Sequence, residues 1–297
     1  MKRALILAAS AMLTLPAHAV TVLTSIKPIQ LLVTELTQGV TSPDVLLQSN
    51  TSPHDYALRP SDVKKIASAD LVIWYGHDLE PFLEKVVSDR SNTLTISQIP
   101  DLDLREFDSE HNHNHDHDGH DHGSHDPHFW LGVSQAQQVA KAVVNQLGSL
   151  DPENAAQYQE NLKKFETELS QTDLEIKKKL SPVKDKGYFV FHDAYGYFEE
   201  RYELNQMGHF TVSPDRKPGA KTLIQIRQKL SSGDVACVFS EPQFTSAVVQ
   251  SVMRGSKVAK GELDPLGSTI EAKPGSYFTF LNNMANNFEQ CLSQKTD

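Results

Sequence analysis

Several features are scarce in this chain of 297 residues, and each scarcity excludes a class of protein. Basic residues are outnumbered, with 28 Lys and Arg against 38 Asp and Glu, so the formal net charge is −10. This balance disfavours nucleic acid and anionic membrane surfaces as partners. No stretch reaches the roughly 20 apolar residues that a membrane-spanning helix needs. The HExxH, GxSxG, Walker and GxGxxG motifs are also missing, so the sequence carries none of these enzyme signatures.

Cysteine is equally scarce, because only Cys237 and Cys291 are present. In an exported protein, a single pair of cysteines predicts a disulfide rather than two free thiols. Closing a loop of this size would stabilise the fold by about 4 kcal/mol on the chain-entropy model. The alternative is a pair of buried thiols.

The first 19 residues have the layout of a secretory signal peptide. A short basic start, "MKR", precedes an almost entirely apolar segment at 4–15, and Pro16 and the small-residue pattern Ala17-His18-Ala19 follow. This pattern predicts cleavage after Ala19. The apolar segment is too short for a membrane anchor, and no cysteine stands at the cleavage site to carry a lipid. We therefore expect an exported and soluble mature protein.

Strand-like and helix-like segments alternate along the mature chain. In the first half, strands are expected at 21–26, 44–48, 71–75 and 93–97, and helices at 28–39, 59–69, 79–89 and 134–150. In the second half, strands are expected at 188–192, 209–212, 236–240 and 257–263, and helices at 194–202, 219–233, 246–255 and 276–294. This alternation predicts an α/β fold with two similar lobes, each a mostly parallel sheet flanked by helices.

One long helix is expected between the two lobes, at 151–181. Its apolar residues recur at helical spacing, at Leu162, Phe165, Leu169, Ile176 and Leu180. Such a helix would span about 40 Å and act as a rigid rod, which predicts little hinge motion. The expected organisation is a signal peptide at 1–19, a first lobe at 20–150, the linking helix, and a second lobe at 182–297.

A low-complexity segment at 108–126 interrupts the first lobe. It contains seven histidines interleaved with Asp, Asn and Gly, namely His111, His113, His115, His117, His120, His122 and His125. Because it has almost no apolar residues, it predicts a mobile loop. A purification tag would lie at a terminus. We expect the loop to bind metal weakly, because each binding event would have to order the chain; the alternative is a solvated spacer.

Three further histidines occupy positions typical of ligand-binding residues in open α/β sheets. His54 follows one expected strand, His192 ends another, and His128 stands between the loop and a helix. Asp264 ends the last expected strand. Ligands of such sheets bind beyond the carboxyl ends of the strands. The alternative for each histidine is a structural or surface role.

The chemistry of this set favours one metal. Three imidazoles with a carboxylate or water suit Zn²⁺, which binds four ligands tetrahedrally, whereas Mn²⁺ and Mg²⁺ prefer more oxygen. Asp55 and Asp193 each stand beside a candidate ligand. Either could accept an imidazole N–H or serve as a helix N-cap.

Several longer motifs resemble one protein family. They are "SPHDYALRPSDVKKIASADLVIW", "HFWL", "GYFVFHDAYGYFEERYEL", "GHFTV", "CVFSEPQF" and "LDPLG". Together they resemble the periplasmic zinc-binding components of bacterial high-affinity zinc importers, which are metal-specific solute-binding proteins of ABC transporters. The resemblance covers nearly the whole mature chain. It implies two α/β lobes joined by a rigid helix, with metal in the cleft.

The resemblance also implies roles for single residues. The family's histidine ligands match His54, His128 and His192. Its aspartate, which binds the metal in manganese-type relatives and lies near it in zinc-type ones, matches Asp264. Some zinc members have Glu directly before the first histidine, where this chain has Pro53. Water and Asp264 therefore both remain candidates for the fourth ligand.

Two further features follow the family pattern. The disulfide of zinc members matches Cys237 and Cys291, and a histidine-rich acidic loop is itself typical of those members. By the same resemblance, His209 is a candidate for an auxiliary weak site together with the loop histidines, and a structural role is the alternative.

We therefore expect a non-enzymatic, monomeric protein that captures Zn²⁺ in the periplasm. It would deliver this transported ligand to an ABC permease in the inner membrane, without inserting into the membrane itself. One alternative is a zinc hydrolase that uses the same histidines and an open water position. Another is a manganese or iron transport protein, which would need more carboxylate ligands.

Overall fold

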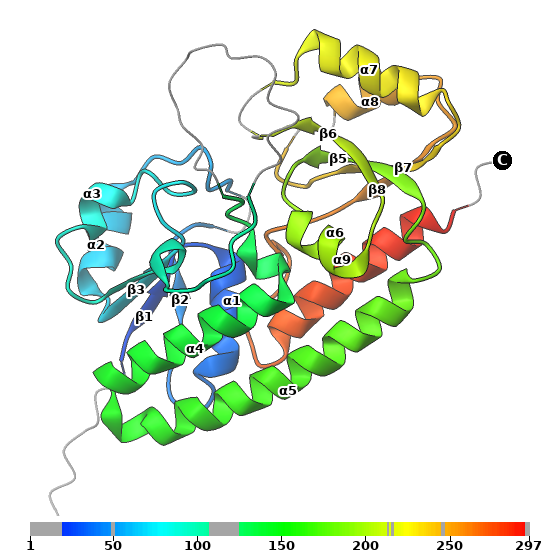
Figure 1. Ribbon diagram of the computed structural model, residues 1–297. Helices are drawn as coiled ribbons and strands as arrows, with labels where there is room; N and C mark the ends of the chain where they lie inside the picture. Colours follow the sequence, from blue (N-terminus) through cyan, green and yellow to red (C-terminus); the bar gives the residue numbers. More distant parts are fainter. Residues whose placement is uncertain are drawn as a thin grey trace, which may run out of the picture.

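The computed structural model describes residues 20–48, 51–106, 125–212, 214, 217–244 and 247–294 (Figure 1). The expected signal peptide and six of the seven loop histidines lie outside these residues. Within the described part of the chain, no helix combines the length and apolarity needed to cross a bilayer.

The first sheet has the strand order β2-β1-β3-β4, and every neighbouring pair is parallel. Its strands are β1 (Val22–Thr24), β2 (Asp44–Val45), β3 (Leu71–Trp74) and β4 (Thr93–Thr95). The helices of this half are α1 (Lys27–Leu36), α2 (Pro60–Ser68), α3 (Glu84–Val87) and α4 (Val133–Leu150). Short 3₁₀ turns lie at Ile96–Gln98 (η1) and Phe129–Leu131 (η3). All four residues of β3 are buried, as expected for a parallel strand covered on both faces.

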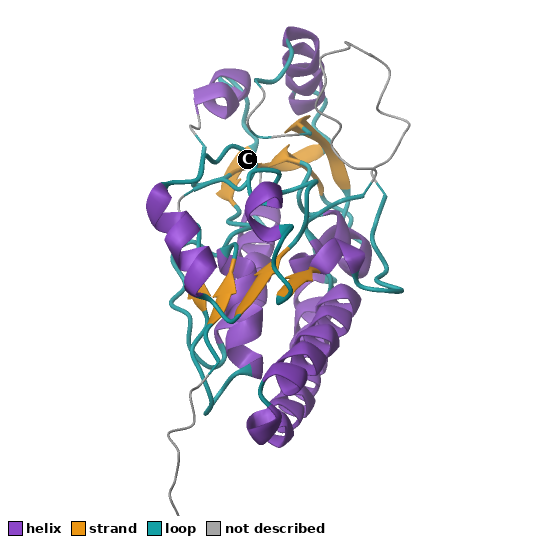
Figure 2. Ribbon diagram, turned by 90° about the vertical axis from the view of Figure 1, so that its left-hand side faces the viewer, coloured by secondary structure: helices purple, strands orange, loops and turns teal. Residues whose placement is uncertain are grey.

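The second sheet repeats the same plan with the order β6-β5-β7-β8, again all parallel. Its strands are β5 (Gly187–His192), β6 (Gln206–Thr211), β7 (Val235–Ser240) and β8 (Ala259–Glu262). Its helices are α6 (Gly196–Tyr202), α7 (Ala220–Leu230), α8 (Ala247–Met253) and α9 (Ser276–Leu292). Figure 2 shows helices packed beside both sheets. The predicted fold class, two parallel α/β lobes with a long helix between them, is confirmed.

The long helix is α5 (Ala155–Leu180), which follows a 3₁₀ turn at Pro152–Asn154 (η4) and runs beneath both lobes (Figure 1). Its buried face contains every apolar residue that the periodicity selected, namely Leu162, Phe165, Leu169, Ile176 and Leu180. Phe165 contacts Tyr277 and Phe278 at the start of α9, with ring centroids 5.7 Å apart in each pair. The helix is therefore packed into the core and is not a free linker.

The two lobes also meet through α9. The carboxylate of Glu35, at the end of α1, accepts hydrogen bonds from the backbone N–H groups of Gly275 (2.9 Å) and Tyr277 (3.2 Å). Most buried apolar side chains of both lobes form one continuous cluster. A second, smaller cluster lies around Phe191 and Phe210 in the second lobe. The shared core joins the two lobes, and little hinge motion stays a prediction.

One expected helix is much shorter than its sequence suggests. The segment 79–89 forms only the single turn α3, Glu84–Val87. The reason is the buried carboxylate of Glu80, which accepts the backbone N–H of Tyr75 at 2.8 Å and holds the chain in a turn instead.

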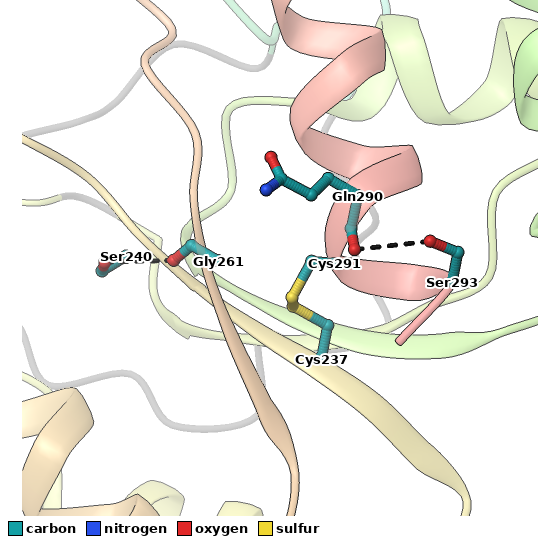
Figure 3. The surroundings of a disulfide bond; sticks show 6 residues. All are labelled: Cys237, Ser240, Gly261, Gln290, Cys291 and Ser293. Carbon is teal, nitrogen blue, oxygen red and sulfur yellow. Dashed lines mark hydrogen bonds between the residues drawn. A yellow bond between two sulfur atoms is a disulfide. The ribbon is translucent and has the colours of Figure 1, made fainter. Parts of the chain in front are cut away.

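The expected disulfide is present. Cys237 of β7 and Cys291 of α9 are bonded, with their Cα atoms 6.0 Å apart, and both side chains are buried (Figure 3). Gly261 of β8 leaves space beside them, because a Cβ atom there would lie 2.5 Å from the Phe239 ring and 3.1 Å from Cβ of Cys291. The bond ties the C-terminal helix to the middle of the second sheet.

Candidate metal centre

Three histidines from distant parts of the sequence converge on one point. One nitrogen from each of His54, His128 and His192 lies within 4.8 Å of the corresponding nitrogens of the other two. Their ring centroids are 5.2 to 5.8 Å apart. The three side chains that the sequence selected are thus brought together in an arrangement that can hold one metal ion.

Each histidine is positioned by a different local element. His54 lies in a turn between β2 and α2, His128 directly precedes η3, and His192 is the last residue of β5. All three therefore lie at the carboxyl ends of parallel strands or in the loops beyond them, where ligands of such sheets bind. His128 and His192 are 3% exposed, whereas His54 is only half-buried. The centre is consequently closed on two sides and reachable from the side of His54.

His128 and His192 are oriented by carboxylates that the sequence analysis did not select. Nδ1 of His128 lies 2.7 Å from Oδ1 of Asp126, and Nδ1 of His192 lies 2.6 Å from Oε1 of Glu241. A carboxylate on Nδ1 leaves Nε2 as the metal-binding atom. The two Nε2 atoms face each other at 3.4 Å. The sequence offered Asp55 and Asp193 for this role, whereas Asp126 and Glu241 fill it for these two histidines.

The alternative role of Asp55 and Asp193 as helix N-caps is wrong for the neighbouring helices. The N-cap of α2 is Arg59, and that of α6 is Tyr195. Both carboxylates that were missed carried a signal in the sequence. Asp126 belongs to the "DPHFW" segment, and Glu241 directly follows the carboxyl end of β7.

Burial controls the protonation of this centre. The pKa of His128 is held well below its usual value, first by burial and then by repulsion from His192, so its imidazole is neutral and ready to bind a cation. Burial raises the pKa of Asp126 to about 7, although the backbone N–H of His128 and the nearby Arg105 act in the opposite direction. A metal ion on His128 would draw electron density from the ring and favour ionised Asp126.

Asp264 does not belong to the group of three histidines that could hold a metal ion, and its oxygens bond to other residues. Its Oδ1 accepts from the side-chain amide of Gln243 (2.7 Å) and from Leu266 N (3.2 Å). Its Oδ2 accepts from the backbone N–H and the hydroxyl of Ser268, at 2.6 and 2.7 Å. The carboxylate thus shapes the loop after β8. Its assignment as a fourth ligand stays a prediction.

A small, partly open cleft lies in front of the histidines. Its lining residues are Ser52, Pro53, His54, His128, Trp130, His192, Pro214, Glu241, Gln243, Phe244, Pro265 and Leu266. Within the described residues, Oε1 of Gln243 is buried without a hydrogen-bond partner. The cleft is largely apolar apart from the three imidazoles, Ser52, Glu241 and Gln243, which suits a small cation better than a polar organic substrate.

Trp130 fastens the His128 segment to the second lobe. Its indole N–H donates to the carbonyl of Pro265 at 2.8 Å, and its own carbonyl accepts from the hydroxyl of Tyr277 at 2.6 Å. The indole is fully buried, and its centroid lies 5.2 Å from the His128 ring. Trp130 is therefore close enough to report metal binding by fluorescence.

The auxiliary histidines are placed only in part. Nδ1 of His209, on β6, lies 3.9 Å from Oδ2 of Asp193, and His209 is outside the group of three. His125 pairs with Glu106 in an isolated antiparallel bridge at the base of the histidine-rich segment. The other six, His111, His113, His115, His117, His120 and His122, lie outside the described residues. The auxiliary weak site stays a prediction.

Comparisons with known proteins agree with this architecture. The family model described as "Zinc-uptake complex component A periplasmic" matches residues 22–291. The high-affinity zinc uptake system protein ZnuA of Yersinia pestis is 41% identical over 288 residues, covering 91% of this chain and 91% of its own. The protein of the same name from Haemophilus ducreyi is also 41% identical, covering 92% and 93% of the two chains.

Two solved structures share the fold. A crystal structure of ZnuA superimposes with a TM-score of 0.78 at 24% identity, covering 93% of this chain and all of the other. The structure of a ZnuA deletion mutant with zinc bound also gives a TM-score of 0.78 at 24% identity, covering 94% of this chain and all of the other.

Proposed function

This chain belongs to the family of periplasmic component A proteins of zinc-uptake complexes, and from that premise we propose that it captures Zn²⁺ and delivers it to an ABC permease for uptake. The observation that carries the proposal is the convergence of three imidazoles within 4.8 Å of one another. Neutral imidazole nitrogens suit Zn²⁺, whereas Mn²⁺ and Mg²⁺ prefer more oxygen ligands. The relatives named above are zinc uptake proteins by name, which supports the same cargo.

The protein acts without catalysing a reaction. A zinc hydrolase needs a general base beside the metal-bound water. Among the described lining residues the carboxylate is Glu241, and its Oε1 lies 2.6 Å from Nδ1 of His192. In this proposal Glu241 therefore orients a histidine and does not act as a base. A manganese or iron carrier would present more oxygen ligands than this centre does.

The fourth ligand in this proposal is a water molecule. Support comes from Asp264, whose two oxygens already accept four hydrogen bonds from Gln243, Leu266 and Ser268. Freeing the carboxylate to bind metal would break bonds that hold its own loop. A water molecule on zinc can instead donate a hydrogen bond to the buried Oε1 of Gln243, which has no partner in the described part of the chain.

The proposal includes the route of the protein to its place of action. The basic, apolar and small-residue pattern of 1–19 acts as a cleaved signal peptide, so the mature chain is periplasmic. It works there as a monomer of two lobes, 20–150 and 182–297, joined by the helix at 151–181. The permease in the inner membrane receives the zinc.

The histidine-rich segment and the tight centre have separate tasks in this proposal. The seven loop histidines, with His209, gather zinc weakly near the cleft, and His128 belongs to the tight centre. Deleting 111–125 while keeping His128 is expected to leave one tight zinc per protein and to remove the weaker extra zinc. Equilibrium dialysis at several zinc concentrations measures both. Loss of the tight zinc in this deletion variant would contradict the division.

The test of the function is a metal competition titration of the mature protein. A zinc chelator of known affinity competes for the metal while tryptophan fluorescence, from Trp74 and Trp130 together, is recorded, and Mn²⁺ is then tested in the same way. We expect one tight zinc per chain and a much weaker response to Mn²⁺. Tighter binding of Mn²⁺ than of Zn²⁺, or no tight zinc at all, would overturn the proposal.

A further inference from the structure

Arg105 spans the two lobes beside the candidate metal centre. It follows η1 in the first lobe, and its Nε donates to Oε1 of Glu200 on α6 of the second lobe at 2.5 Å. Its Nη1 lies 3.4 Å from Oδ2 of Asp126. The Arg105 side chain is 16% exposed and that of Asp126 is fully buried, so solvent screens this contact little.

Asp126 links Arg105 to the candidate zinc ligand His128. While Oδ2 faces Arg105, Oδ1 accepts from both the ring Nδ1 (2.7 Å) and the backbone N–H (3.0 Å) of His128. The two oxygens of one carboxylate thus face opposite partners. Glu200, Arg105, Asp126 and His128 form a continuous chain from α6 to the metal-binding nitrogen.

The backbone around Arg105 strengthens this chain. The hydroxyl of Tyr197, on α6, accepts from Arg105 N at 3.0 Å and donates to the carbonyl of Asp126 at 2.8 Å. The backbone N–H of Asp126 in turn donates to the carbonyl of Arg105 at 2.7 Å. Arg105 and Asp126 are therefore fixed to each other and to α6 by main-chain as well as side-chain groups.

Gly196 leaves room for the guanidinium to lie against α6. A Cβ atom at this first residue of α6 would lie 2.5 Å from Cζ and Nη1 of Arg105 and 2.6 Å from Nε. The backbone of Gly196 does not have a positive φ, so its conformation suits any residue. A side chain at this position would therefore force the guanidinium of Arg105 to shift away from the helix.

We propose that Arg105 is a positioning residue of the zinc centre, which holds Asp126 so that His128 faces His192 across the lobe boundary. The inference rests on the proposed zinc function and adds a residue through which one lobe orients a ligand of the other. Partners that orient a metal ligand typically contribute 10–100-fold to metal affinity. Preorganisation of the two lobes also reduces the ordering free energy that opposes metal binding.

The first test compares Arg105→Ala and Arg105→Lys with wild type and with Arg201→Ala. Arg201 is a matched control because it lies on the same α6 and pairs with Asp173 of α5 (Nε to Oδ1, 2.9 Å) without contacting Asp126 in the described structure. Zinc affinity is measured by chelator competition, and the geometry of the centre by the visible absorption spectrum of the Co²⁺-loaded protein. Melting temperatures report folding separately.

We expect a 10–100-fold loss of zinc affinity and an altered Co²⁺ spectrum in both Arg105 variants. Arg105→Lys keeps the charge but cannot reach Glu200 and Asp126 together, so it should rescue folding more than affinity. Arg201→Ala should keep the wild-type affinity and spectrum even if its melting temperature falls. Wild-type affinity and an unchanged spectrum in Arg105→Ala would overturn the inference. Failure of the wild-type protein to bind zinc would instead overturn the proposed function, and this inference with it.

The second test is a double-mutant cycle with Gly196→Ala. An alanine at this helix position raises helix propensity, so the single variant should lose affinity only because the added methyl group displaces the guanidinium of Arg105. In the Arg105→Ala, Gly196→Ala double variant this clash is gone, and we expect no further loss beyond Arg105→Ala alone. Losses that add up independently would show that Gly196 does not act through Arg105 and would count against the proposal.

Discussion

The two lobes have the same topology but use it differently. In both sheets the first strand of the lobe lies second in space, β2-β1-β3-β4 in one and β6-β5-β7-β8 in the other. The strands of the first sheet contain two to four residues. In the second sheet β5, β6 and β7 contain six residues each, and a disulfide fastens α9 to β7. The second lobe thus has the longer strands, and a disulfide cross-links it.

The metal centre does not follow the symmetry of the lobes. His192 ends β5, whereas the equivalent strand β1 ends at Thr24 and is followed by Ser25. Glu241 follows β7 and orients His192, whereas Glu80 follows the equivalent β3 and accepts the backbone N–H of Tyr75. The same edge of the same topology therefore orients a candidate metal ligand in one lobe and shapes a turn in the other. Function here depends on side chains that the common plan does not dictate.

The strongest test of the comparison removes one histidine at a time. His54→Ala and His128→Ala alter the first lobe and His192→Ala alters the second, and each removes one of the three proposed metal ligands. We expect each to lose tight zinc binding, by more than the roughly 100-fold that loss of an outer partner costs, with the fold retained. Chelator competition measures the affinity, and circular dichroism checks the fold.

The control for these variants is His77→Ala. His77 lies in the first lobe, is 58% exposed at its side chain, and pairs with Glu84 away from the centre. It should bind zinc as tightly as wild type. Tight binding that survives in any one of the three ligand variants would remove that histidine from the centre and leave the others.

The next largest effect concerns the disulfide of the second lobe. Replacing Cys237 and Cys291 together by alanine removes a cross-link across 54 residues. On the chain-entropy model this lowers the free energy of unfolding by about 4 kcal/mol. Urea unfolding of the oxidised wild type and the double variant measures the difference. Because only the second lobe contains the disulfide, the variant should also unfold less cooperatively. A decrease in the free energy of unfolding below about 1 kcal/mol would show that α9 is held by packing alone.

The spacing of apolar residues in the sequence predicted most of the helices and strands of the fold. The face of α5 was readable from Leu162 to Leu180 because a 3.6-residue repeat fixes which side chains meet the core. The prediction of a helix at 79–89 was wrong over most of its length. The conformation of this segment depends on one buried carboxylate, that of Glu80, which accepts a hydrogen bond from the backbone N–H of Tyr75. A single tertiary contact of this kind outweighs local helix propensity and leaves no period in the sequence.

For the candidate metal centre, the sequence predicted the three histidines but not the residues that orient them. The three histidines carried a signal because each stands at a strand end or before a helix. Asp126 and Glu241 also stand in suggestive places, but the sequence could not pair them with their histidines. His192 and Glu241 are 49 positions apart, and which carboxylate reaches an imidazole depends on how two strands lie side by side. The contact of Arg105 with Gly196 joins the two lobes and is invisible before they are assembled.

The third prediction tests the different use of Glu80 in the first lobe. Burial raises its pKa to about 7, from an ordinary value of 4.5. Between these two values the folded protein keeps the proton and the unfolded chain releases it, so Glu80 makes stability fall as the pH rises from about 4.5 to 7. Above pH 7 the full cost is present, about 3 kcal/mol. Below pH 4.5 both states are protonated and the cost vanishes.

Glu80→Gln keeps an acceptor for Tyr75 N–H and cannot ionise. Relative to wild type, it should gain up to about 3 kcal/mol of stability at about pH 8 and nothing at about pH 4.5. Urea unfolding at both pH values measures the gain. The exposed Glu84→Gln is the control and should follow the wild-type pH dependence. An equal stability change at the two pH values would mean that packing, and not ionisation of Glu80, is responsible.

The smallest expected effect concerns Asp264, the carboxylate at the edge of the second sheet. Its oxygens are engaged by Gln243, Leu266 and Ser268, so we expect it to support the loop that lines the cleft without binding the metal. Asp264→Ala should therefore weaken zinc binding by about 10-fold, at the low end for an outer partner. Glu241→Ala, which frees His192 to rotate, should lose more, up to about 100-fold. Chelator competition on both variants gives the ranking. If Asp264→Ala lost as much affinity as His192→Ala, the carboxylate would be the fourth ligand, and the second lobe would supply half of the coordination instead of one bond.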